Sequence, residues 1–120
     1  MKTRGIRGAI TVKKNASDEM ITATIRLLAE MNRSNKIKTD DIAAIIFSAT
    51  PDLNAEFPAR AAREIGLTRI PLFCTVEINV PNSLKKCIRV LMLVNTSLKQ
   101  DKIKHIYLEE AKVLRQEFSA

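Results

Sequence analysis

The chain has 120 residues, of which 46% are hydrophobic, so it can bury the core of one domain over residues 1–120 and is not expected to be disordered. Only 4% of the residues are aromatic and none is Trp, which predicts an aliphatic core that would gain stability from oligomerisation. The net charge of +7 suits an anionic partner, but the basic residues are scattered, which argues against nucleic acid and favours a small anion.

Other classes of protein are disfavoured by the sequence. No run approaches the roughly 18 apolar residues of a membrane span, and the first residues lack the apolar segment of a secretion signal. Cys74 and Cys87 are too far apart for a metal knuckle, with only His105 to assist, so we expect no metal. We expect reduced thiols, a cytoplasmic location, and a surface or strand-edge position for His105.

The first half of the chain predicts two strands, each followed by a helix. Residues 4–13 alternate between apolar and small or charged residues, which indicates a strand. Residues 17–33 follow capping residues and carry an apolar stripe at helical spacing, so they should cover a sheet. The continuous apolar run at 41–50 predicts a strand covered on both faces, and a short second helix is expected from Pro58 to Gly66.

The second half predicts three more strands. They are expected at residues 70–80, in the apolar run at 87–94, and more weakly at 105–114, with a short polar tail beyond. The resulting element order indicates an α+β fold: a five-stranded mixed sheet with two helices on one face. Because residues 88–94 are apolar on both faces, we expect a partner subunit to cover the face without helices.

Charged residues interrupt these apolar strands. Glu77 lies in the third strand and Arg89 in the fourth, and a buried charge needs a partner or a ligand, so this pair marks the centre of a candidate site. Arg7 lies among small residues of the first strand, and Arg60 and Arg63 lie three apart on the second helix. For these three arginines a solvent-facing position is the commoner interpretation, and an anion pocket is the alternative.

Four long segments resemble the small monofunctional chorismate mutase of bacteria, of the trimeric and not the all-helical type: RGIRGAITV (4–12), SATPDLNAEFPARAARE (48–64), LKKCIRVLMLVNT (84–96) and IKHIYLEEAKVLR (103–115). The resemblance implies a homotrimeric pseudo-α/β-barrel with active sites between subunits. It implies the Claisen rearrangement of chorismate to prephenate, on the route to Phe and Tyr, with no cofactor, covalent intermediate, nucleic acid or membrane.

The resemblance also implies roles for individual residues. Arg89 would stabilise the charge that grows on the departing ether oxygen, Glu77 would accept a hydrogen bond from the ring hydroxyl, and Arg7 would bind the dianion. We expect Glu77 and Arg89 on neighbouring strands, where substrate and not each other neutralises them. Further substrate-binding residues implied by the motifs are Tyr107, Cys74, Phe57, Arg60, Arg63, Leu72, Phe73, Leu114 and Arg115.

One difficulty and two alternatives remain at this point. Cys74 and Glu77 are three residues apart, so a regular strand places them on opposite faces. Either the strand bulges or ends between them, or one of them belongs to a site of the neighbouring subunit. The alternatives to an isomerase are a non-catalytic anion-binding trimer and a deaminase of enamines and imines on a similar trimeric barrel. A dianion needs two positive anchors, so the pair of Arg7 and Arg89 favours the isomerase.

Overall fold

The computed structural model describes residues 1–118, and the side chains of residues 1–115. The last two residues of the expected tail lie outside the described part. The strands and α-helices are β1 (Lys2–Thr11), α1 (Ser17–Asn35), β2 (Ile42–Ala49), α2 (Ala59–Glu64), β3 (Leu72–Val76), β4 (Cys87–Thr96) and β5 (Ile106–Leu108). Short 3-10 helices are η1 (Thr39–Asp41), η2 (Gln100–Lys102) and the longer η3 (Glu109–Phe118). Within residues 1–118 no helix has the length and apolar content that crossing a membrane requires.

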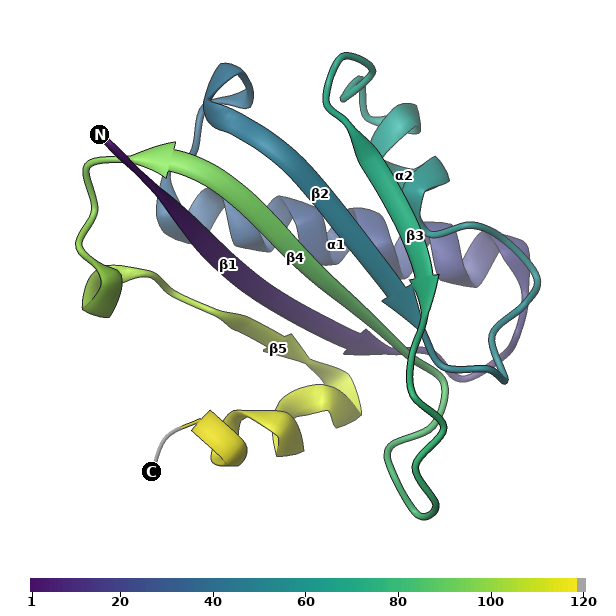
Figure 1. The fold of residues 1–120 in the computed structure, drawn as a ribbon. Coiled ribbons are helices and arrows are strands. Elements are labelled where there is room, and N and C mark those ends of the chain that lie inside the picture. Colours follow the sequence, from purple (N-terminus) through teal and green to yellow (C-terminus); the bar gives the residue numbers. More distant parts are fainter. Residues whose placement is uncertain (119–120) are drawn as a thin grey trace.

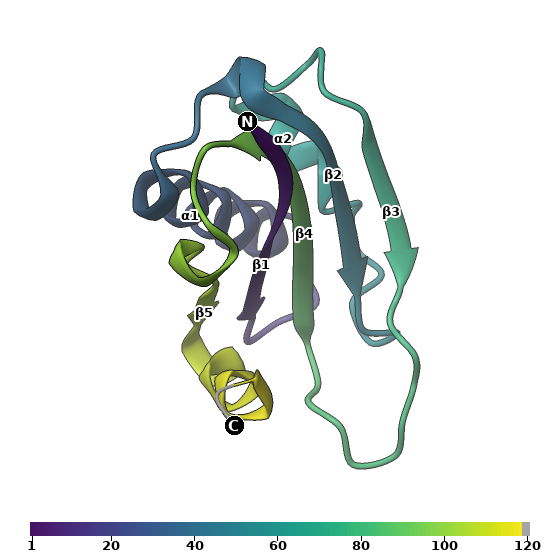
Figure 2. The same cartoon turned by 60° about the vertical axis from the view of Figure 1, so that its left-hand side comes forward.

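The five strands form one mixed sheet in the order β3-β2-β4-β1-β5. The central strand β4 is antiparallel to both of its neighbours, whereas the outer pairs β2–β3 and β1–β5 are parallel. Both α-helices lie behind this sheet in the view of Figure 1 and on one side of it in Figure 2. The expected five-stranded mixed sheet with helices on one face is therefore confirmed.

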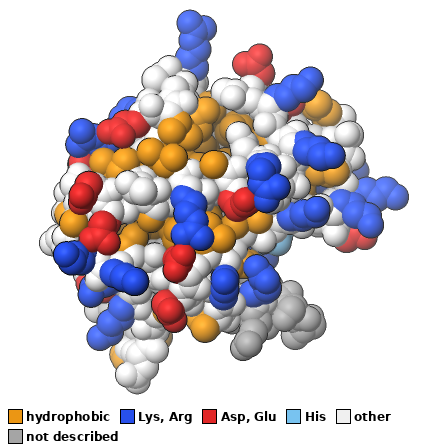
Figure 3. Space-filling model, turned by 180° about the vertical axis from the view of Figure 1, so that it is seen from behind, with side chains coloured by type: hydrophobic (Ala, Val, Ile, Leu, Met, Phe, Trp, Pro, Cys, Tyr) orange, Lys and Arg blue, Asp and Glu red, His pale blue; other side chains and the backbone are white. Residues whose placement is uncertain are grey.

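The main core lies between the helices and the sheet. Alternate residues of the strands, such as Ile6, Phe47 and Met92, pack here against the apolar stripe of α1. Gly8 allows this helix to approach closely, because a Cβ atom at that position would lie 2.4 Å from the Sδ atom of Met31. The outer side of this layer, seen in Figure 3, carries basic and acidic side chains interspersed with apolar ones, as a solvent-facing surface does.

Helix α1 is tied to the segment before β5 by the buried side chain of Asn35. Its Nδ2 atom donates to the carbonyl of Lys104 at 2.9 Å, and its Oδ1 atom accepts from the Lys104 N–H at 2.8 Å. The helix therefore ends two residues later than predicted, where Lys36 turns the chain with a φ of 52°. The second helix lies within its predicted limits, and Gly66 follows it with a φ of 92°.

The face of the sheet that looks toward the viewer in Figure 1 carries no α-helix. Its side chains include Arg7 of β1, Leu91 of β4 and Ile46 of β2, which face one another in register. Leu91 is 37% exposed and Phe73 of β3 is 66% exposed. The prediction that the second strand is covered on both faces is wrong for a single chain, since only its helix side is packed.

The third strand is shorter than the predicted 70–80. It ends at Val76, and the Glu77 N–H donates once more, at 2.9 Å, to the carbonyl of Ala49, the last residue of β2. Because β2 ends there, nothing remains for a longer strand to pair with. Residues 77–86 instead form a loop that projects beyond the sheet (Figures 1 and 2).

The fifth strand is also shorter than the predicted 105–114. It stops at Leu108, because Glu109 takes a left-handed conformation with a φ of 54°, and η3 follows. This helix turns Ala111 and Leu114, three residues apart, toward a second, smaller core cluster on the face without α-helices. The stretch that looked like a weak strand is mostly a helix that covers one end of that face.

Candidate active site

A cavity of about 250 Å³ opens on the face of the sheet that has no α-helices. The strands β1, β2 and β4 form its floor, with apolar contributions from Ile46, Val90 and Leu91. Four of the residues expected in a site line this cavity together: Arg7, Glu77, Arg89 and Tyr107.

Glu77 and Arg89 form an ion pair at the wall of this cavity. The Nη1 atom of Arg89 donates to the Oε1 atom of Glu77 at 3.0 Å, and both side chains are partly buried. Two expectations are therefore corrected. The residues do not come from neighbouring strands, because β2 lies between β3 and β4, and they pair with each other in the structure. Pairing avoids the cost of leaving two partly buried charges without a partner.

Ser48 on the intervening strand β2 is part of the same network. It faces Arg89 in the β2–β4 register, and its hydroxyl donates to the Oε2 atom of Glu77. Each carboxylate oxygen of Glu77 therefore has its own donor. Ser48 was not among the predicted site residues, although it is the one hydroxyl within the observed strand β2.

Arg7 reaches the cavity from β1, and His105 contacts its backbone. The Arg7 N–H donates to the Nδ1 atom of His105 at 2.9 Å. Burial, together with the nearby charge of Arg7, lowers the pKa of His105. His105 lies just before the edge strand β5, as expected of a strand-edge histidine, but its contact with a candidate site residue was not foreseen.

The Glu77–Arg89 pair also borders a second hollow, of about 410 Å³, toward η3 and the loop after β3. Leu114 of η3 lines it, so this predicted residue lies beside the pair. Tyr107 is buried in the cluster that Leu114 and Cys87 share. Burial raises the pKa of the Cys87 thiol to about 11, so it remains protonated at neutral pH.

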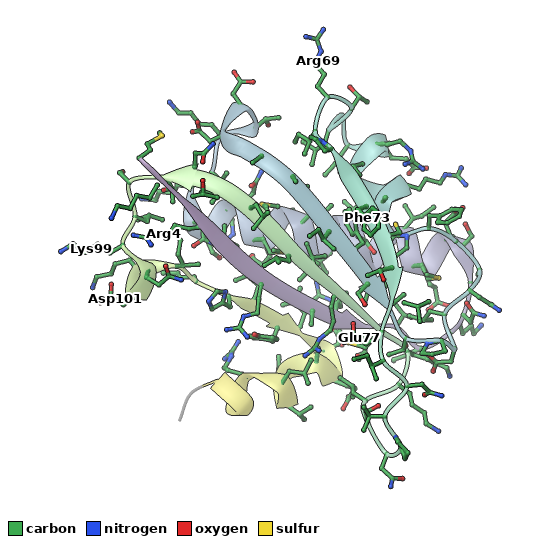
Figure 4. The ribbon with its side chains drawn as sticks, in the orientation of Figure 1. Arg4, Arg69, Phe73, Glu77, Lys99 and Asp101 are labelled. Atoms are coloured by element: carbon green, nitrogen blue, oxygen red, sulfur yellow. The ribbon has the colours of Figure 1, made fainter. Side chains whose placement is uncertain are left out.

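The other predicted site residues lie elsewhere in the chain. Leu72 and Cys74 pack against the main core on the helix side of β3, whereas Phe73 stands exposed on the other side (Figure 4). Four more of the predicted residues lie at the surface outside the cavity. Phe57 precedes α2, Arg60 and Arg63 belong to α2, and Arg115 belongs to η3. Arg60 is paired there with Glu56 at 2.7 Å and with Glu64 at 3.3 Å.

Cys74 and Glu77 lie on opposite faces of the sheet, as a regular strand requires. The β2–β3 register runs without a shift from Leu72 to Val76, so no bulge turns Cys74 toward Glu77. Within one chain the side chains of Cys74 and Glu77 do not meet.

Comparison with known proteins gives the family. The profile of the family described as chorismate mutase type I matches residues 3–118. The chain belongs to the chorismate mutase type I family. It is 46% identical over 120 residues to chorismate mutase AroH of Bacillus subtilis (strain 168), covering 99% of this chain and 94% of that protein. The corresponding protein of Thermus thermophilus is 49% identical over 113 residues, 93% of each chain.

A solved structure agrees with this assignment. The chorismate mutase from Clostridium thermocellum has 53% sequence identity and a TM-score of 0.91, covering 92% of this chain and 98% of that one. The family inferred from the four sequence segments is thus confirmed, as is the fold. The anion-binding and deaminase alternatives are not favoured by these similarities.

The chemistry available at the site of this chorismate mutase type I chain comes from fixed charges. The cavity offers two guanidinium groups, on Arg7 and Arg89, and the carboxylate of Glu77. Among the described side chains, no three His, Cys, Asp or Glu residues gather in a way that could bind a metal ion. A site of this kind binds an anion and stabilises charge that shifts within it.

Proposed function

We propose that the cavity lined by Arg7, Glu77 and Arg89 is the site where this chain, an isomerase of aromatic amino-acid biosynthesis, rearranges chorismate to prephenate. The observation that carries the proposal is the Glu77–Arg89 pair at the cavity wall of a chain in the chorismate mutase type I family. This pair places a positive and a negative group within one ligand's reach, as the polarised transition state of the reaction requires.

The reaction breaks a C–O bond while a C–C bond forms, so negative charge grows on the departing ether oxygen. A guanidinium directed at that oxygen binds the transition state more tightly than the ground state, which is the condition for catalysis. We assign this role to Arg89 and assign a substrate carboxylate to Arg7. No proton moves and no covalent intermediate forms, so neither a general base nor a nucleophile is required.

The substrate must separate the ion pair when it binds. Once Arg89 turns to the ether oxygen, the Oε1 atom of Glu77 can accept a hydrogen bond from the ring hydroxyl, while Ser48 still donates to Oε2. The carboxylate then lies beside the ring, where positive character develops. Tyr107 lines the same cavity, and Leu114 supplies an apolar wall nearby that favours a compact substrate conformer.

The proposal includes a homotrimer with its active sites between subunits. Exposed apolar side chains on the face without α-helices, among them Leu91 and Phe73, support a partner subunit there. Phe57, Arg60 and Arg63 lie outside the cavity of their own chain. In the trimer each subunit would contribute these three residues to the cavity of a neighbouring subunit. The same arrangement would bring Cys74 to a neighbour's Glu77.

We also propose a cytoplasmic location, which suits the free thiols of Cys74 and Cys87.

The test is to mix the purified protein with chorismate and to follow the loss of chorismate absorbance. We expect turnover by the native chain and a loss of at least about a hundredfold in kcat for Arg89→Ala, as for other transition-state donors. Arg89→Lys should fail almost as badly, because an ammonium group cannot reproduce the planar fork of donors.

The matched control is Arg33→Ala, which removes an arginine paired with Glu30 on the exposed side of α1. This variant should keep native turnover. If the native chain does not consume chorismate, the proposed function is wrong. If Arg89→Ala turns over at the native rate, the role given to Arg89 is wrong.

A further inference from the structure

We propose that His105 is a positioning residue for Arg7, whose backbone N–H is fixed by the neutral imidazole so that the guanidinium is presented to the cavity. The inference rests on the proposed function, because it takes Arg7 as a substrate-binding residue. It concerns the strand from which Arg7 projects, since the imidazole contacts the main chain of Arg7 and does not line the cavity.

The first step of the argument is the position of the contact at the end of a strand pair. The parallel pairing of β1 and β5 begins at Gly8 with Ile106 and extends to Ile10 with Leu108. Arg7 lies one residue before this pairing, and its N–H donates to the His105 Nδ1 atom at 2.9 Å. The imidazole therefore extends the contact between the two strands by one residue, to the residue that enters the cavity.

The second step is that His105 is itself held in place. The residue before it, Lys104, is bound through both its N–H and its carbonyl to the buried side chain of Asn35. Asn35 belongs to α1, which lies directly against β1 at Gly8. The backbone on both sides of His105 is thus fixed relative to β1, through β5 on one side and through α1 on the other.

The third step is the charge state that the contact requires. A ring nitrogen that accepts a hydrogen bond carries no proton, so the imidazolium form of His105 cannot make this contact. Among the elements packed against this region, β1 presents the charge of Arg7 and α1 presents the uncharged Asn35. Helix η3 carries Glu109, which is paired with Arg26, and Glu110. Burial and the Arg7 charge lower the pKa of His105 and so favour the accepting, neutral form.

The sign of the pH dependence follows from this. At a pH above the lowered pKa the imidazole is neutral and fixes the Arg7 backbone. As the pH falls through that pKa, the ring nitrogen gains a proton, the contact is lost and the Arg7 backbone is no longer fixed. Substrate binding should therefore weaken on the acid side, below the ordinary histidine pKa of about 6.5.

His105 is the only histidine of the chain, so its titration can be followed without ambiguity by NMR. We expect its ring signals to titrate with a midpoint below about 6.5, and the Arg7 amide signal to shift with the same midpoint. This measurement needs no chorismate, so its outcome is separate from that of the proposed function. An Arg7 amide that is indifferent to the titration of His105 would overturn the inference.

Two substitutions complete the test. His105→Asn places an amide oxygen close to where Nδ1 stands and cannot be protonated, whereas His105→Ala removes the acceptor. We expect His105→Ala to lower kcat/KM for chorismate about fivefold to tenfold, mainly through KM, as for one lost hydrogen bond. His105→Asn should stay near the native value at neutral pH and lose the acid decline. A native pH profile in both variants would contradict the positioning role.

Discussion

Each oxygen of the Glu77 carboxylate has its own donor, Arg89 for one and Ser48 for the other. The two donors differ in what happens to them when substrate binds. In the proposed reaction Arg89 turns from Glu77 to the substrate, whereas Ser48 stays on the floor of the cavity. We therefore expect the hydroxyl of Ser48 to keep the Glu77 carboxylate oriented when Arg89 turns to the substrate.

At this residue scale we predict that Ser48→Ala lowers kcat/KM for chorismate by about three- to tenfold, the effect of one hydrogen bond. The matched control is Ser97→Ala, which removes an exposed hydroxyl in the loop after β4 and should change nothing. Steady-state kinetics on both variants, with circular dichroism to verify folding, provide the measurement. Equal kinetics for Ser48→Ala and the native chain would show that Glu77 needs no second donor.

These single residues also show which features of a site can be predicted from a sequence. Glu77 and Arg89 were predicted because a charge in an apolar strand is costly and therefore conspicuous. Ser48 was missed because a hydroxyl group is common in such a strand and its hydrogen-bonding requirement is easily met. The contact of His105 could not be predicted, because its partner is a backbone N–H that lies 98 residues earlier in the chain.

Among the elements, η3 differs most from its prediction, and it shapes the site. Its buried residues Ala111 and Leu114 pack against Cys87 and Tyr107 and close one end of the face without α-helices. The spacing of three between these two residues is helical, but Ile106 and Leu108 before them alternate as in a strand. The left-handed φ of Glu109 separates the two patterns, and nothing in the residue type of a glutamate predicts it.

The reactivity of the Cys87 thiol measures how well η3 covers this side chain. With a pKa of about 11 and a buried position, it should react slowly with a thiol reagent at pH 8 in a Cys74→Ser background, and faster as the pH rises. We predict that Leu114→Ala increases this rate at least about tenfold, because it removes the side chain that covers Cys87.

The control is Val113→Ala, one residue earlier and 56% exposed, which should leave the labelling rate near the native value. Following the rate with a chromogenic disulfide reagent gives a direct comparison. If both variants label at the same rate, η3 does not act as the cover of Cys87.

For the whole molecule, the sequence predicted the mixed sheet and the side on which its helices pack, because hydrophobic periodicity reports which face of each element is buried. It did not predict that β2 lies between β3 and β4, since strand order is set by contacts between distant parts of the chain. For the same reason the residues alone do not predict which subunit of the proposed trimer would supply each part of a site.

The trimer proposed above predicts complementation between two inactive variants. If Arg89 and Arg63 of one site come from different subunits, every mixed trimer of Arg89→Ala and Arg63→Ala chains contains one intact site. Random mixing in equal amounts, by refolding the chains together, should then restore about a quarter of native activity.

Arg89→Ala mixed with Arg7→Ala is the control for this experiment. Both residues line the cavity of one chain, so no mixed trimer regains an intact site and activity should stay at the level of the parents. Activity of the first mixture no higher than the average of its two parents would contradict the shared sites.

The ion pair at the wall of the cavity has a consequence for which anions can enter. Glu77 is tethered beside Arg89, so it competes with every incoming carboxylate at an effective concentration in the millimolar range or above. An acetate or chloride ion gains too little from one guanidinium to displace it. In the proposed site a ligand with two anionic groups would engage Arg7 as well and win this competition, so we expect the enzyme to discriminate against simple carboxylates.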